Sequence, residues 1–154
     1  MQEMHAVANR DVTKITLEGV PDRPGIAAEV FGRLGSRGFN VELVVSTGGT
    51  AGRADISLAV ARADQSNVLR AMEALRDEVG AQGLVVNSAV ALVSIVGANL
   101  STEPGIAGRM FRALSSGGIN IEVISTSMSS VTCMIEEART EEALRALKSE
   151  FGLV

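Results

Sequence analysis

The sequence predicts an α+β protein made of two fused copies of one small unit, each with antiparallel strands and two helices on one face. The main observation is an internal repeat: Pro24-Gly25 returns 80 residues later as Pro104-Gly105, and Asn40 returns as Asn120 with no gap between. A repeat of this length is the size of a small domain. Composition is globular, 46% hydrophobic with four Phe, no Trp and no Tyr, which predicts an aliphatic core.

The first copy is expected over residues 11–88. Alternating β-branched residues predict a strand over 13–19. A helix follows, with Asp22 as its cap, Pro24 in its first turn and an apolar stripe that ends before Gly38. The remaining predicted elements are a strand over 41–45, a glycine-rich hairpin loop over 46–52, a strand over 55–60, a helix capped by Asp64, and a strand over 84–86. The order β-α-β-β-α-β is the split βαβ or ferredoxin-like arrangement.

The second copy is expected over residues 89–154. Its predicted elements are strands over 91–96, 119–125 and 131–135 and helices over 104–116 and 140–151. Almost no chain remains for a last strand. Residues 1–10 belong to neither copy, so we expect this segment to supply the missing strand. A strand so near the first residue also suggests a chain cut from a longer protein.

Composition and motifs exclude several functions. The net charge is −4 with scattered basic residues, which argues against nucleic acid or an anionic membrane as a partner. No apolar run reaches membrane-spanning length, no signal peptide is present and Cys133 is alone, so we expect a cytoplasmic protein. His5 is the single histidine, and no residue set has catalytic or metal-ligand spacing. We therefore expect no catalytic residues, no metal site and no cofactor in this chain.

The repeated Pro-Gly loop is suited to binding a small molecule. A helix N-terminus offers free backbone N–H groups and partial positive charge to a carboxylate, and Gly25 permits close approach. Asp22 can pair with an ammonium group, so the loop suits a free α-amino acid. The alternative is purely structural: Asp22 caps the helix, and Pro and Gly shape the turn. In the second copy Thr102 replaces Asp22, so the first loop is the better ammonium site.

Two stretches, Gly19–Ala28 and Asn120–Ser127, resemble the regulatory region of aspartate kinase, which consists of tandem ACT domains. The closing Phe151-Gly152-Leu153 is also typical of that family. The resemblance implies feedback control of aspartate phosphorylation by an end-product amino acid, threonine or lysine. It implies as partners an aspartate kinase catalytic domain or α subunit, because some members make this region separately as a β subunit. A homodimer through the ACT sheets is also implied.

The resemblance further implies a set of effector contacts. The second-copy members of the set would face the first copy within the pair or across a dimer. The expected contacts are Asp22, Gly25, Ile26, Ala27, Asn40, Val41, Ser46, Asn120, Ile121 and Ser127. The sequence departs from the family at Ser46, where feedback-sensitive members carry glutamine, and at Met128 and Ser130, where they carry an acidic residue and arginine. These departures leave open an alternative function, a dimerisation or assembly module with degenerate effector sites.

Overall fold

A computed structural model describes residues 3–48, 51–98 and 100–154. The chain divides into two compact units. One unit is Asp11–Ser88, and the other is Ala89–Val154 together with the N-terminal segment through Arg10.

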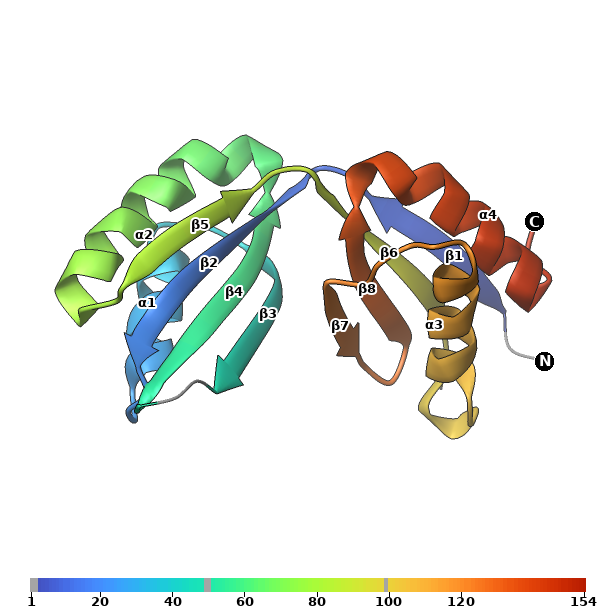
Figure 1. Cartoon of the computed structure of the whole chain (residues 1–154), viewed down its shortest axis with the longest axis horizontal. Coiled ribbons are helices and arrows are strands. Elements are labelled where there is room, and N and C mark those ends of the chain that lie inside the picture. The colour runs from blue at the N-terminus through green and yellow to red at the C-terminus, as the bar shows by residue number, and fades with distance from the viewer. Residues whose placement is uncertain (1–2, 49–50, 99) are drawn as a thin grey trace. The chain divides into compact units, whose positions relative to one another are not determined.

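The unit Asp11–Ser88 is a four-stranded antiparallel sheet with two helices on one face (Figure 1). Its elements are β2 (Val12–Pro21), α1 (Ile26–Ser36), β3 (Val41–Gly48), β4 (Arg53–Ala61), the short 3₁₀ turn η1 (Arg62–Asp64), α2 (Gln65–Val79) and β5 (Gly83–Asn87). The strand order is β3-β4-β2-β5, with every neighbouring pair antiparallel. Between β2 and β4 the register shifts after Leu17, so β2 contains a bulge.

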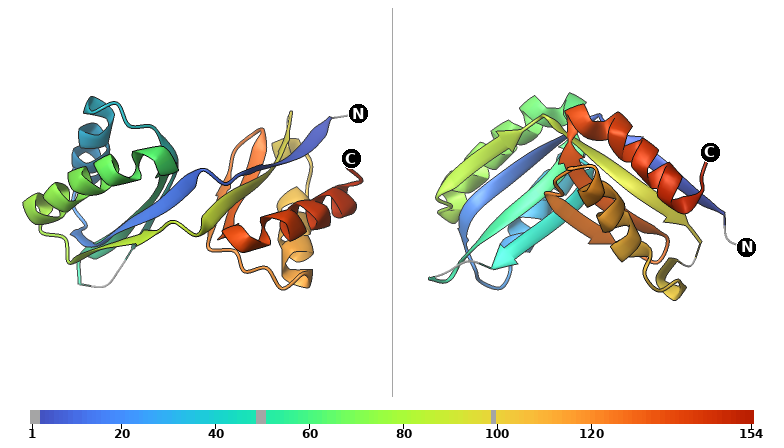
Figure 2. Two further views of the ribbon diagram at one scale, coloured as in Figure 1. Left: turned by 90° about the horizontal axis from the view of Figure 1, so that it is seen from above. Right: turned by 45° about the vertical axis from the view of Figure 1, so that its right-hand side comes forward.

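The second unit has the same plan, but its fourth strand comes from the start of the chain. Its elements are β1 (Met4–Asn9), β6 (Val90–Gly97), η2 (Leu100–Thr102), α3 (Ile106–Ser116), β7 (Val123–Thr126), β8 (Ser130–Glu136), η3 (Glu137–Arg139) and α4 (Thr140–Phe151). The sheet order is β1-β6-β8-β7, and β1 runs antiparallel to β6 with Met4 opposite Gly97 and Asn9 opposite Leu92 (Figure 2). The predicted completion of this unit by the N-terminal strand is confirmed.

Each unit has its own aliphatic core between sheet and helices. In the first, the predicted stripe of α1 is buried at Ile26, Val30 and Leu34 and packs with residues of α2 and the sheet. In the second, Met110 and Leu114 of α3 meet Leu147 of α4. The helical periodicity therefore identifies the core faces correctly. No helix within the described residues is long and apolar enough to cross a membrane.

Both predicted Pro-Gly helices begin later than the sequence indicates. Gly25 occupies the N-cap position with φ 91°, no side chain caps the helix, and α1 starts at Ile26. Gly105 does the same with φ 87° before α3. The prediction that Asp22 caps α1 is therefore wrong. Asp64 does stand at the N-cap position of α2, but its side chain makes no capping hydrogen bond.

Two predicted strands also have different limits. The strand expected over 119–125 begins at Val123, because the Ile119 N–H bonds back to the Leu114 carbonyl at the end of α3. The strand expected over 41–45 continues through Gly48, which places Ser46 in β3 rather than in a loop. Of the predicted loop 46–52, Gly49 and Thr50 lie outside the described residues.

Candidate functional site

The loop between β2 and α1 is held by backbone hydrogen bonds. The Asp22 N–H donates to the Gly52 carbonyl at 2.8 Å, and the Ile26 N–H donates to the Arg23 carbonyl at 3.3 Å. Gly25 takes the left-handed conformation that turns the chain into α1, and a Cβ built there meets no atom within 4 Å. The backbone at the start of α1 is therefore open to a ligand.

The charges of this loop favour a zwitterionic ligand. Asp22 is exposed, and its carboxylate makes no hydrogen bond or ion pair within the described part of the chain. The neighbouring Arg23 is paired with the Glu29 carboxylate at 3.1 and 3.2 Å. The Ala27 N–H, in the first turn of α1, has no acceptor inside the helix, whereas the Ile26 N–H already donates to the Arg23 carbonyl. An unpaired carboxylate thus stands near the anion-binding end of a helix.

Ser46 lies at the same end of the sheet as this loop. Near the end of β3, Gly48 is opposite Ala54 of β4, and Ala54 is in turn opposite Val20 of β2. Two strand spacings of about 4.8 Å therefore separate the ends of β3 and β2. Ser46 is exposed, two residues before Gly48.

Asn40 and Val41 lie at the opposite end of α1. The eleven residues of α1 separate them from Gly25, which is about 16 Å at the helical rise per residue. Val41 opens β3 as predicted. The structure of this unit therefore brings Asp22, Gly25, Ile26, Ala27 and Ser46 to one end and leaves Asn40 and Val41 at the other. Ile26 itself is buried in the core, so it offers a ligand only its backbone.

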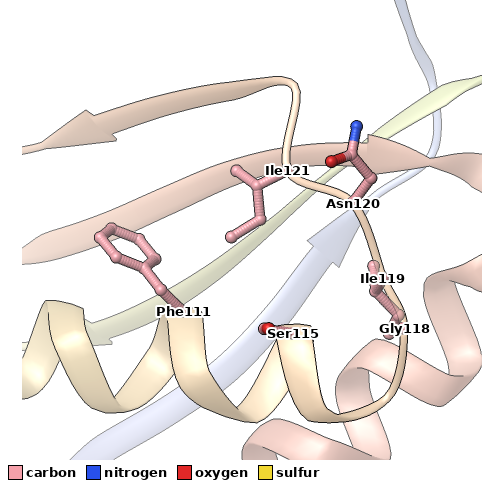
Figure 3. A pocket seen from close by; sticks show the side chains of 6 residues that line it. All are labelled: Phe111, Ser115, Gly118, Ile119, Asn120 and Ile121. Atoms are coloured by element: carbon pink, nitrogen blue, oxygen red, sulfur yellow. The ribbon is translucent and has the colours of Figure 1, made fainter.

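In the second unit, Asn120 and Ile121 line an open pocket beside α3. The pocket has a volume of about 420 Å³. Figure 3 shows the side chains of Ile121 and Phe111 converging on one side of α3, while the Asn120 amide points away from the helix. The full lining is Phe111, Ser115, Gly118, Ile119, Asn120 and Ile121. Sequence reasoning missed Phe111 and Ser115 as lining residues, although the helical stripe of α3 could have indicated Phe111.

Ser127 lies away from this pocket, at the turn between β7 and β8. Its hydroxyl lies 3.0 Å from the Ser130 hydroxyl and accepts the Ser129 N–H at 3.2 Å. Ser130 thus supports the turn. Met128 is 69% exposed. Ser127 and Asn120 bracket the ends of the segment that contains β7, so the structure does not place them side by side.

Within the described residues, no group of three or more His, Cys, Asp or Glu side chains could hold a metal ion. Cys133 is buried in the core of its unit, and burial raises the pKa of its thiol to about 12. Sequence reasoning also missed Arg53, whose guanidinium donates a 2.7 Å hydrogen bond to the Gly19 carbonyl just before the loop.

Comparison with known protein families shows to which class of proteins this chain belongs. The ACT domain family matches residues 15–80 and again residues 93–151, one match in each structural unit. The chain is therefore a tandem ACT-domain protein, with one ACT domain in each structural unit.

Similar solved structures show which kind of tandem ACT-domain protein this chain is. The regulatory subunit of aspartate kinase from Thermus thermophilus superposes with a TM-score of 0.90 at 34% identity, covering 95% of this chain and 96% of that one. A chain of the aspartokinase alpha and beta subunits superposes with a TM-score of 0.90 at 32% identity, covering 96% and 97%. The chain belongs to the family of aspartate kinase regulatory subunits.

Full-length aspartate kinases are also similar. The enzyme of Stutzerimonas stutzeri is 38% identical over 145 residues, which is 94% of this chain and 35% of that protein. The chain thus spans about a third of the length of this curated relative.

Proposed function

We propose that this chain is the regulatory region of an aspartate kinase and binds threonine or lysine as a feedback effector. The observation that carries the proposal is the exposed, unpaired Asp22 carboxylate at the open start of α1. An α-ammonium group would pair with Asp22, and the α-carboxylate would accept N–H groups of the first turn of α1. The similarity to the Thermus regulatory subunit over nearly the whole chain supports this assignment.

The proposal assigns distinct roles to the predicted contacts. Gly25, Ile26 and Ala27 supply backbone groups, and Ser46 faces the side chain of the effector. Asn120 and Ile121 offer the backbone of an irregular segment, in which only Glu122 is bonded to β8, through its N–H to Met134. Asn40 and Val41 form the corresponding segment of the first unit. We assign Ser127 to a site at the second Pro-Gly loop.

The proposed partners are a second copy of this chain and an aspartate kinase catalytic domain or α subunit in the cytoplasm. The similarity of this chain to a chain in the solved structure of the aspartokinase alpha and beta subunits supports a separate catalytic partner. Val85 on β5 and Val7 on β1 leave nearly half of their side chains exposed on edge strands, which supports a dimer through the sheets. A coupling free energy of about 1–3 kcal/mol between effector and catalytic site would suffice for control.

The competing proposal is an assembly module whose effector sites are degenerate. Ser46 favours it, because a short hydroxyl stands where feedback-sensitive relatives carry a long amide side chain. Under this proposal the chain forms dimers but binds no free amino acid.

Thermal unfolding with added amino acids separates the two proposals. We expect threonine or lysine at millimolar concentration to raise the unfolding midpoint, with methionine and isoleucine as comparison ligands. Asp22→Ala should abolish the shift, while Glu73→Ala, which removes an exposed carboxylate from α2, should retain it. No shift with any of the four amino acids, together with a dimer by light scattering, would establish the assembly function instead.

A further inference from the structure

The strand that leads into the Asp22 loop contains a bulge. Leu17 is opposite Ile56 and Val20 is opposite Ala54, so Glu18 and Gly19 together face the single residue Asp55. Gly19 has φ 61°, a left-handed conformation that glycine adopts without the steric cost of a Cβ. The backbone conformation of Gly19, three residues before Asp22, therefore sets the direction in which the chain leaves β2 and enters the loop.

Two side chains of β4 hold the peptide groups of this bulge. The Asp55 carboxylate accepts the Gly19 N–H at 2.9 Å. The Arg53 guanidinium donates to the Gly19 carbonyl at 2.7 Å. Charged groups strengthen both hydrogen bonds relative to neutral partners. The bulge is thus fixed from the neighbouring strand by an acid and a base two residues apart.

Arg53 also reaches the end of α2. The same nitrogen, Nη1, donates to the Gly80 carbonyl at 3.0 Å, and Gly80 is the left-handed C-cap of α2. A cation suits this position because the C-terminal carbonyls of a helix carry partial negative charge. One nitrogen therefore joins the root of the loop to the end of a helix.

Gln82 makes a second connection between the same two segments. Its N–H donates to the Glu18 carbonyl at 2.8 Å. Its side chain lies so close over Gly19 that a Cβ at residue 19 would collide with it. The bulge is therefore joined to the segment that follows α2 by a backbone hydrogen bond and by a side-chain contact as well as through Arg53.

We propose that Arg53 is the positioning residue of the Asp22 loop and the link by which occupancy of that loop reaches the C-terminus of α2. It acts through Gly19 and does not itself contact the ligand. The identity of the ligand rests on the proposed function, whereas the link between loop and helix does not.

Amide hydrogen exchange of the whole chain tests the link without any ligand. Arg53→Met keeps the aliphatic stem and removes both hydrogen bonds. We expect exchange to rise several-fold in peptides covering 18–23 and 80–83 together. Arg53→Lys, whose ammonium can still bridge two carbonyls, should restore most of the protection in both. Arg70→Met, an exposed arginine on α2, is the matched control and should change neither.

Unchanged exchange in either segment of Arg53→Met would overturn the proposal. Equal loss of protection throughout the unit would also overturn it, because it would indicate general destabilisation rather than a link. If Arg53→Met does not fold, Arg53→Gln is measured by the same criterion.

A second arm uses threonine and lysine as probes. For whichever amino acid binds the wild-type chain, we expect about tenfold weaker binding to Arg53→Met, near wild-type binding to Arg53→Lys, and slower exchange over 80–83 when it is bound. Equal affinity in Arg53→Met would refute the positioning role. If neither amino acid binds the wild-type chain, the proposed effector is wrong, while the exchange result still decides the link.

Discussion

Arg139, in η3, is hydrogen-bonded to the carbonyl of Gly117 at the end of α3, with a distance of 2.7 Å from Nη2 to oxygen. The same guanidinium bonds the Glu142 carboxylate at 2.6 Å, and this bond lowers the pKa of the Glu142 carboxyl. Arg139 therefore fixes the segment that continues from Gly118 to Ile121 along the pocket of Figure 3.

Removing this arginine should loosen that segment. We expect Arg139→Met to raise amide exchange over 118–121 several-fold while leaving the β6–β8 pairing protected. Arg145→Met, on the exposed face of α4, is the control. Glu142→Gln should reproduce part of the effect, because Arg139 then loses its charged partner. Wild-type exchange over 118–121 in Arg139→Met would contradict the role given to Arg139.

The glycine that precedes α1 and a glycine in the middle of α1 should respond oppositely to substitution by alanine. Gly25 has φ 91°, so Gly25→Ala should destabilise the unit Asp11–Ser88 by about 1–2 kcal/mol. Gly32 lies within α1 with open space at its Cβ position, so Gly32→Ala should stabilise by about 0.5–1 kcal/mol. Denaturant unfolding measures both. Equal effects would mean that the backbone at Gly25 is not held in the left-handed conformation.

The two faces of β1 allow a matched pair of substitutions. Ala6 packs against the core of the second unit, whereas Val7 is 46% exposed. A buried unpaired carboxylate is costly, so Ala6→Asp should unfold or strongly destabilise that unit, and Val7→Asp should leave it folded. Circular dichroism and limited proteolysis report the outcome. Equal tolerance of both substitutions would contradict the seating of β1 against β6.

The thiol of Cys133 provides a pH-dependent test. Burial raises its pKa from 9.0 to about 12. The native thiol should therefore resist alkylation at pH 8 and react once the unit unfolds. Because the folded-state pKa is the higher one, the stability contributed by Cys133 is complete below pH 9 and is lost as the pH rises towards 12. In Cys133→Ala, the loss of stability above pH 9 should be smaller than in the wild type.

The spacing of apolar residues along the sequence was enough to predict most of the fold. The stripe through Val30 and Leu34 gave the core face of α1, and the short second copy indicated that the N-terminal strand must complete it. The helix starts were misplaced because Asp22 before Pro-Gly has the composition of a cap, while the left-handed Gly25 redirects the backbone first. Ile119 and Ile121 alternate like a strand, but the bond from Ile119 to α3 prevents pairing there.

The candidate site was less predictable than the fold. Sequence order sets Asn40 next to the strand that follows the Asp22 loop, yet α1 carries it to the far end of the unit. Arg53 was missed because its partners are the backbone carbonyls of Gly19 and Gly80, which leave no mark in side-chain spacing. Residues that act through backbone groups become visible only in three dimensions.

Strand β1 is synthesised before the unit 11–88, whereas its partner β6 is synthesised after that unit. Residues 11–88 form a contiguous unit, so it can close as soon as its last strand leaves the ribosome. The segment Met4–Asn9 must then wait, without its partner, for β6 and the rest of residues 89–154, roughly 3 to 13 seconds at ordinary translation rates. A nascent chain whose residue 88 has just left the ribosome should thus already show protease resistance over 11–88, while the segment Met4–Asn9 remains cleavable. Until β6 has been made, the backbone N–H and C=O groups of this segment lack the ladder partners that they have in the folded sheet, as those of an edge strand do.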